Sequence, residues 1–262
     1  HLRTRRQRQM CIRDRYDPHI PFNMLRIFKK EDQTFGQFNG GEIIENKPIG
    51  FPHEAFVLKP FSNLFYWAHA IATKDSTIGL HPHKGFEILT YVLKGRIRHY
   101  DTKIEKWVSL KKGDVQLIQS GSGISHSEHL YDKSEIFQIW FDPDLSKSLN
   151  KEPQYKDYKE KEFENINGIK TIIGTSSDIN IDSDVFMFEY DIKKEFDLEL
   201  DKNRIHTFYL ISGEIKIDKN IVSKDSFFIY SNVDNIKLIC SEESILFHIS
   251  VPNKLNYETY YK

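Results

Sequence analysis

Two short motifs, HPHKGFE at residues 81–87 and GSGISHSE at residues 121–128, decide how this chain is organised. Each motif carries two metal-binding residue types separated by one position. Positions i and i+2 of a β-strand point to the same face, so each pair can aim into a barrel together. Three imidazoles and one carboxylate inside a barrel would hold a divalent transition metal and leave positions open for a ligand. The four candidate metal ligands are His81, His83, His126 and Glu128.

Short strand-like runs separated by glycine turns fill the rest of the chain. Gly95 and the segment Lys112-Gly113-Asp114 are typical of hairpin turns. In the first half we expect strands at 86–93, 96–101, 106–110, 115–119, 123–130 and 136–141. In the second half we expect them at 169–173, 185–190, 196–200, 206–211, 214–217, 226–230, 236–240 and 245–251. Many short strands at this spacing predict an all-β fold, as a sandwich or barrel.

The two halves show a faint internal repeat. FYLISGEI at 208–215 echoes TYVLKGRI at 90–97, and LFHI at 246–249 echoes IFQI at 136–139. We therefore expect one barrel per copy. The second copy has neither an H-x-H nor an H-x-E pair, so we expect it to lack a metal. His206 and His248 stand alone there and are interpreted as ordinary barrel histidines, as is His69 in the first half.

The charged stretch SLNKEPQYKDYKEKEFEN lacks an apolar period and is predicted to be a linker across the surface, with room for at most one short helix because of Pro153. The predicted parts are a non-native or disordered head at 1–23, an N-terminal barrel with the metal site at 24–145, the linker at 146–165 and a degenerate barrel without metal at 166–262.

The first half resembles the pirin family, a branch of the cupin superfamily. HPHKGFEILTYVLKG followed by GDVQLIQSGSGISHSE is similar to the family's two motifs, in the same order, and the likeness covers roughly residues 51–158. Lys84 departs from the family's usual arginine. The resemblance implies two cupin-type β-barrels, a bicupin. It also implies non-haem iron as the metal, with His81, His83, His126 and Glu128 as its ligands.

The residues leave the metal and the role of Glu128 open. Imidazole and carboxylate without sulfur suit Fe(II), Mn(II), Ni(II), Cu(II) or Zn(II). Glu128 could also accept a proton from a phenolic or enolic substrate, as a general base. Glu87 is the competing carboxylate, because in many other cupins the glutamate after H-x-H is a ligand. Gln116 and Gln138 could orient the ligands or only satisfy strand ends.

Composition restricts the class of protein. The 262 residues suit two barrels, and the net charge of −1 favours neither nucleic acid nor membrane. Residues 1–15 carry +5, which leaves −6 for the remainder. This arginine-rich head could be a nucleic-acid arm or a transit peptide, but QRQMCIRDR resembles translated sequencing-adapter read-through. Cys240 is the single thiol outside the head, which suits a reducing compartment, and we expect a cytoplasmic protein.

Two hypotheses for function follow. The first is a metal-dependent dioxygenase, because some pirins show quercetin 2,3-dioxygenase activity. Its substrates would be O2 and a small flavonol-like aromatic compound. The second is a metal or redox sensor without catalysis that binds a protein partner, as the eukaryotic pirins do in transcription. Substrate-dependent O2 consumption separates them.

Overall fold

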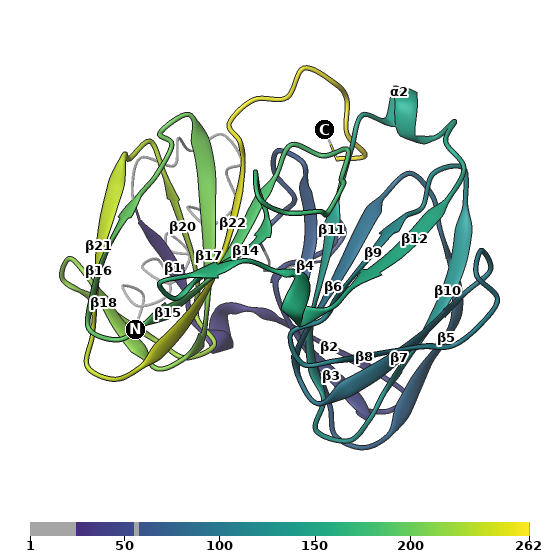
Figure 1. Ribbon diagram of the computed structural model, residues 1–262, viewed down its shortest axis with the longest axis horizontal. Helices are drawn as coiled ribbons and strands as arrows, with labels where there is room; N and C mark the ends of the chain where they lie inside the picture. Colours follow the sequence, from purple (N-terminus) through teal and green to yellow (C-terminus); the bar gives the residue numbers. More distant parts are fainter. Residues whose placement is uncertain (1–24, 55–57, 262) are drawn as a thin grey trace, which may run out of the picture.

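The protein consists of two β-barrels side by side (Figure 1). The computed structural model describes residues 25–54 and 58–261. Each barrel combines a seven-stranded and a four-stranded sheet, with antiparallel pairing between neighbouring strands. The predicted all-β fold of two barrels is confirmed. In the described part of the chain, no helix is long and apolar enough to cross a membrane.

The first barrel contains the strand order β12-β9-β6-β11-β4-β3-β2 in its large sheet and β5-β10-β7-β8 in its small sheet. Its strands are β2 (Thr34–Phe38), β3 (Ile43–Ile49), β4 (Leu64–Ala72), β5 (Ser76–His83), β6 (Glu87–Lys94), β7 (Arg96–Asp101), β8 (Val108–Lys111), β9 (Val115–Gln119), β10 (Ile124–Leu130), β11 (Glu135–Phe141) and β12 (Gln154–Tyr158).

The second barrel repeats this plan, with orders β1-β20-β17-β22-β15-β14-β13 and β16-β21-β18-β19. Its strands are β1 (Arg26–Phe28), β13 (Asn165–Ile166), β14 (Ile169–Ile173), β15 (Phe186–Ile192), β16 (Glu195–Glu199), β17 (Arg204–Ser212), β18 (Glu214–Ile217), β19 (Asn220–Ser223), β20 (Phe227–Ser231), β21 (Asn235–Cys240) and β22 (Ser244–Pro252). Within residues 25–54 and 58–261, the helical pieces are α2 (Leu145–Ser148) and the 3-10 turns η1 (Lys30–Asp32) and η2 (Glu160–Glu162).

Two segments lie in sheets where the predicted boundaries did not place them. Strand β1 was predicted to belong to the first barrel, but it pairs with β20 of the second barrel and covers the edge of that sheet. This pairing places the ring centroids of Phe28 and Phe227 6.0 Å apart. Strand β12, inside the predicted linker 146–165, pairs with β9 of the first barrel. The predicted head at 1–23 lies outside the described residues.

Strand patterning explains which faces are buried. Strand β21 alternates strictly between exposed and buried residues, with Ile236, Leu238 and Cys240 inside, as expected for a sheet with one wet face. Strands β4 and β17 are buried almost throughout. They lie in the two large sheets, which face each other between the barrels (Figure 1).

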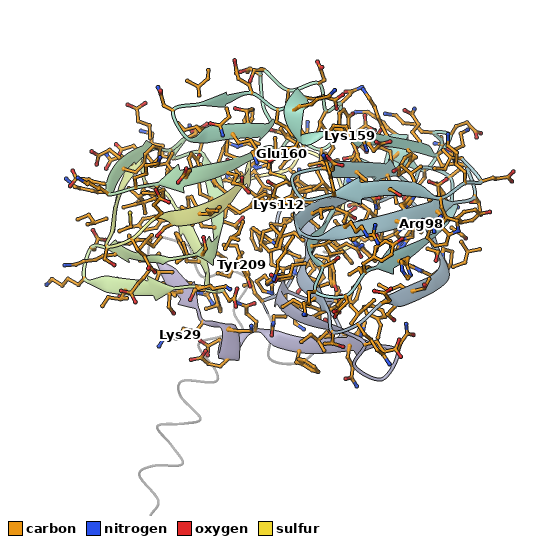
Figure 2. The ribbon with its side chains drawn as sticks, turned by 60° about the horizontal axis from the view of Figure 1, so that its bottom comes forward. Lys29, Arg98, Lys112, Lys159, Glu160 and Tyr209 are labelled. Atoms are coloured by element: carbon orange, nitrogen blue, oxygen red, sulfur yellow. The ribbon has the colours of Figure 1, made fainter. Side chains whose placement is uncertain are left out.

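Aromatic rings from both barrels form the core between the large sheets. Trp67 on β4 and Phe137 on β11 pack against Phe247 on β22, with ring centroids 5.7 and 5.0 Å apart. Tyr209 lies in the same layer (Figure 2). Its hydroxyl group is 3.1 Å from His69 Nδ1, and His69 Nε2 is 3.3 Å from Glu135. His69 is therefore a hydrogen-bonded core residue, as predicted.

The internal repeat is visible in equivalent turns. Gly95 lies between β6 and β7, Gly213 lies between β17 and β18, and both have positive φ, 74° and 83°. In each case the chain leaves the large sheet and enters the small sheet at this turn, so Gly95 does not form the predicted hairpin. A Cβ at Gly95 would collide with the side chain of Ser134, just before β11, and a Cβ at Gly213 would collide with that of Ser244, at the start of β22. The same backbone constraint thus recurs in both barrels, which supports a duplicated origin for the two echoing sequences.

The C-terminal segment, residues 253–261, leaves β22 and returns to the first barrel (Figure 1). The Tyr260 N–H donates to Asp142 Oδ2 at 2.6 Å, and its hydroxyl donates to the Lys84 carbonyl at 3.1 Å. The Tyr260 ring also lies 4.6 Å from the Phe86 ring. This segment therefore fixes the loop that follows β5. Burial raises the pKa of Asp142 to about 6, although the Tyr260 N–H partly opposes this.

Replacing Phe247 with alanine should destabilise both barrels together. Removing a fully buried phenylalanine costs about 3–5 kcal/mol of unfolding free energy. All three tryptophans lie in the first barrel, at 67, 107 and 140. We expect tryptophan fluorescence to show an unfolding midpoint at a lower denaturant concentration than in wild type, although the substituted residue lies in the second barrel. The exposed Ile221→Ala is the control. An unchanged fluorescence midpoint would show that the barrels unfold independently.

Asp142 should make stability fall as pH rises. Its folded pKa of about 6 exceeds the unfolded value near 4, so its protonated form stabilises the fold at low pH, and this contribution is lost as pH rises from about 4 to 6. Asp142→Asn does not titrate. We expect the variant to gain about 1–2 kcal/mol relative to wild type between pH 4.5 and pH 7 in denaturant titrations. An identical difference at both pH values would contradict the assignment.

Candidate metal centre

Three histidines converge inside the first barrel. His81 and His83 are two residues apart on β5, and His126 lies on the paired strand β10, directly opposite His81. One ring nitrogen from each lies within 4.8 Å of the others. The Nε2 atoms of His83 and His126 are only 2.9 Å apart. Strand pairing therefore places three of the four predicted ligands within reach of a single ion.

The histidines are held in the state that binds metals. Gly79 accepts a hydrogen bond from His81 Nδ1 at 2.7 Å, which leaves the lone pair of His81 on Nε2. Burial, reinforced by the neighbouring imidazoles His126 and His81, lowers the pKa of His83 to about 3. Burial and the imidazoles His81 and His99 also lower the pKa of His126 well below its usual value. Neutral imidazoles are the ligand form.

Hydrogen bonds among the described residues do not satisfy this cluster. His126 Nδ1 is buried without a partner in the described structure, and its Nε2 faces only another imidazole nitrogen. Buried polar atoms in native proteins are normally paired. A divalent transition metal would supply the shared partner that three imidazoles and a nearby carboxylate need. The donor set therefore fits such an ion.

Glu128, the fourth predicted ligand, approaches His126 from another side. It is almost fully buried and forms a second candidate group with His126 and His99, so the two groups share His126. Its Oε1 accepts hydrogen bonds from Thr90 Oγ1 and Gln116 Nε2, at 3.1 and 3.0 Å. Gln138 donates to Oε2 at 2.7 Å. The two glutamines, whose role the sequence left open, both position this carboxylate.

Sequence reasoning missed His99 and Asp101. His99 Nε2 donates to Asp101 Oδ2 at 2.6 Å, and the N–H groups of Lys103 and Ile104 donate to Oδ1. Burial alone would raise the pKa of Asp101, but these hydrogen bonds outweigh it and the pKa is lowered. His99 Nδ1 remains buried without a partner among the described residues. The i, i+2 spacing on β7 was the available signal.

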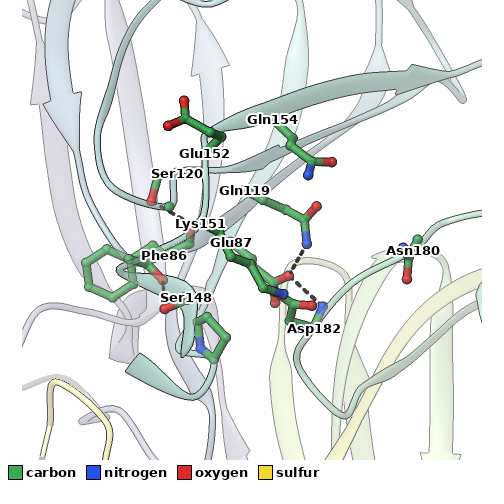
Figure 3. A pocket seen from close by; sticks show the side chains of 13 residues that line it. Phe86, Glu87, Gln119, Ser120, Ser148, Lys151, Glu152, Gln154, Asn180 and Asp182 are labelled. Carbon is green, nitrogen blue, oxygen red and sulfur yellow. Dashed lines mark hydrogen bonds and ion pairs between the residues drawn. The ribbon is translucent and has the colours of Figure 1, made fainter. Parts of the chain in front are cut away.

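Glu87 joins the two barrels and is not part of either candidate metal group in the described residues. Its carboxylate accepts hydrogen bonds from Gln119 at 2.7 Å and from the N–H groups of Asp182 and Ser183 at 2.6 and 2.9 Å (Figure 3). Burial outweighs these donors and raises its pKa. The competing carboxylate of the H-x-H motif therefore connects β6 to the loop before β15.

The sequence suggested that the two histidines of the second barrel stand alone, but the structure brings them together. His206 and His248 face each other, with Nδ1 and Nε2 3.0 Å apart. His248 Nδ1 contacts the Tyr190 hydroxyl, and His206 Nε2 contacts the Asp201 carbonyl. All four ring nitrogens thus have protein partners. Their interpretation as ordinary barrel histidines fits this chain of hydrogen bonds.

A cavity of about 470 Å³ leads to the candidate metal centre. His83 reaches it from inside, and Lys84, Thr102 and Ser125 line its polar parts. Its lining residues come from β5, β10, the loops next to them and the turn after β7, all in the first barrel. The Trp140 ring packs edge-on against His83 at 4.8 Å and narrows this side of the site.

Comparison with known proteins identifies the family. The Pirin family model matches residues 2–141. A candidate quercetin 2,3-dioxygenase of Pasteurella multocida is 27% identical over 72% of this chain and 83% of its own length. Quercetin 2,3-dioxygenase of Escherichia coli strain K12 is 28% identical over 45% of this chain, and the match spans half of that enzyme.

A solved structure shows the same fold. The bacterial pirin YhhW from Escherichia coli in complex with nickel(II) superposes with a TM-score of 0.76 at 19% identity, over 88% of this chain and all of that one. Both barrels are included in this coverage, which establishes the predicted bicupin fold. With its two motifs, its three converging histidines and the matching family model, the chain belongs to the pirin family.

Proposed function

We propose that this protein is a metal-dependent dioxygenase that cleaves flavonol-like aromatic substrates with O2. The observation that carries the proposal is the cluster of His81, His83 and His126, three imidazoles within 4.8 Å of one another beside an open cavity. Support for the substrate class comes from the named activity of the E. coli relative. That match spans half of the relative's length, so the reaction itself is our inference.

His81, His83, His126 and Glu128 would hold the metal, and Fe(II) is the preferred ion. Imidazole and carboxylate ligands also suit Mn(II), Ni(II), Cu(II) and Zn(II), and the related YhhW was solved with nickel(II). Bound there, Fe(II) would supply Lewis acidity and redox chemistry toward O2 and a chelating substrate.

Glu128 is the residue that would move a proton. Its Oε1 accepts two hydrogen bonds and Oε2 accepts one. A carboxylate oxygen has two lone pairs, so Oε2 keeps one for the metal or for the hydroxyl proton of the substrate. Gln138 fixes the direction of that lone pair. The same carboxylate can therefore act as ligand and as general base.

The cavity mouth would select and shield the substrate. Lys84 and the hydroxyl groups of Thr102 and Ser125 offer polar contacts at the rim, whereas Trp140 presents an aromatic edge beside His83. A flat, hydroxylated aromatic molecule matches this combination, with its hydroxyl groups toward the histidines and its rings between the walls.

Removing a proposed ligand should remove the metal. His83→Ala and His126→Ala each delete one imidazole from the shared site, and we expect their iron content after reconstitution to fall far below one per chain. His206→Ala and His248→Ala remove imidazoles from the other barrel and serve as matched controls that keep one metal per chain. Elemental analysis measures this. Two metals in wild type, or metal loss in a control variant, would contradict a single site.

Glu128→Gln tests the dual role. The amide oxygen can still coordinate, but it cannot accept the substrate's proton. Loss of a general base typically slows a reaction by ~10²–10⁴-fold, so we expect that loss in flavonol-dependent O2 uptake per bound metal. Glu87→Gln, a buried carboxylate outside the site, is the control.

A wild-type rate per metal in Glu128→Gln would make the carboxylate a ligand without a base role. If wild type loaded with Fe(II), Mn(II) or Ni(II) consumes no O2 with any flavonol, the dioxygenase proposal fails, and a sensor that binds a partner protein takes its place.

A further inference from the structure

The second barrel has a cavity of its own, which the proposed dioxygenase function does not use. It measures about 360 Å³ and lies among β14, β15, β17 and β22. Phe186, Phe188 and Tyr190 are at alternate positions of β15, so their rings line the same side. Phe186 and Phe188 remain half-exposed, whereas Tyr190 is buried. An aromatic wall thus leads from the surface to a buried hydroxyl group.

The floor of this cavity is a hydrogen-bond chain with one direction. The Asp201 carbonyl can only accept, so His206 Nε2 carries the hydrogen at their 2.9 Å contact. In neutral His206 the Nδ1 atom then accepts from His248 Nε2, 3.0 Å away. His248 Nδ1 in turn accepts from the Tyr190 hydroxyl at 3.0 Å. The Tyr190 oxygen therefore ends the chain as an acceptor for a further donor.

The two histidines on the floor of the cavity are uncharged, and acidic residues lie at its rim. Burial lowers the pKa of both His206 and His248, which keeps the two adjacent imidazoles neutral near pH 7. The Arg204 guanidinium donates hydrogen bonds to Ser250 and Asp184, at 2.8 Å each. Glu199 and Asp201 line the cavity at exposed positions. A negatively charged ligand would meet acidic side chains and find a neutral floor.

We propose that this cavity is a second small-molecule site, which binds a neutral, planar aromatic compound with a hydroxyl group, of the phenol class. The ring packs against Phe186 and Phe188, and its O–H donates to the Tyr190 oxygen. His248, stacked on Phe208 at 4.4 Å with a 14° tilt, fixes the acceptor end of the site. The volume lies in the range of natural ligand pockets and admits one or two rings.

Binding of phenol to His83→Ala without metal tests this site apart from the first barrel. Isothermal titration and saturation-transfer NMR should show phenol bound to wild type and to His83→Ala with equal affinity. Anisole, which has the ring but no O–H, and benzoate, which is anionic, should both bind more weakly. These probes need no turnover, so failure of the dioxygenase proposal would leave the result intact.

Two variants locate the bound probe. Tyr190→Phe keeps the ring and deletes the hydroxyl oxygen that accepts the phenol O–H. Phenol should therefore bind about fivefold to tenfold more weakly, which is the loss expected for one hydrogen bond. Binding of anisole, which has no O–H to donate, should not change. Thr171→Phe places a ring inside the cavity and should abolish phenol binding. Ile166→Phe, an exposed position on β13 of the same sheet, is the matched control. Melting temperatures check that each variant is folded.

Three results would overturn the proposal. They are the absence of phenol binding to wild type, loss of binding in His83→Ala, and unchanged binding in folded Thr171→Phe.

Discussion

The antiparallel pairing of β5 with β10 is the constraint on which the candidate metal centre depends. It sets His81 opposite His126 and brings His83 onto the same face, two residues along. The pairing has an irregularity between His126 and Glu128, and such bulges re-aim side chains at functional sites. Three imidazoles then meet beside an open cavity, and His126 Nδ1 has no partner among the described residues. In the second barrel the histidine pair has protein partners instead, because Tyr190 and Asp201 complete its hydrogen bonds.

Packing between the two barrels ties this site to the rest of the chain. The large sheets share an aromatic core that includes Trp67, Phe137 and Phe247. Glu87 and the Tyr260 contacts add polar connections on the side of the H-x-H loop. The C-terminal segment thus holds the loop after His83. Mutations in the second barrel can therefore affect the first without touching a ligand.

Strand periodicity and turn glycines predicted much of the fold, because each is a local signal. The H-x-H and H-x-E pairs and the echo around Gly95 and Gly213 are examples. Placement of β1 and β12 was not predictable in this way. Strand β1 has only three residues, and β12 (QYKDY) lies in a charged stretch without an apolar period, so neither carries a local signal for its partner strand. The spacing of His99 and Asp101 on β7 was visible in the sequence, but the nearness of His99 to His126 becomes apparent only when β7 pairs with β10. The pairing of His206 with His248, 42 residues apart, is also a product of the tertiary fold.

Anomalous diffraction from crystals of the iron-loaded protein tests the central claim most directly. The account predicts one iron peak per chain, at bonding distance from His81, His83, His126 and Glu128, and no peak beside His206 and His248. A peak between His99 and Glu128 that lies out of reach of His81 and His83, or a peak in the second barrel, would contradict it.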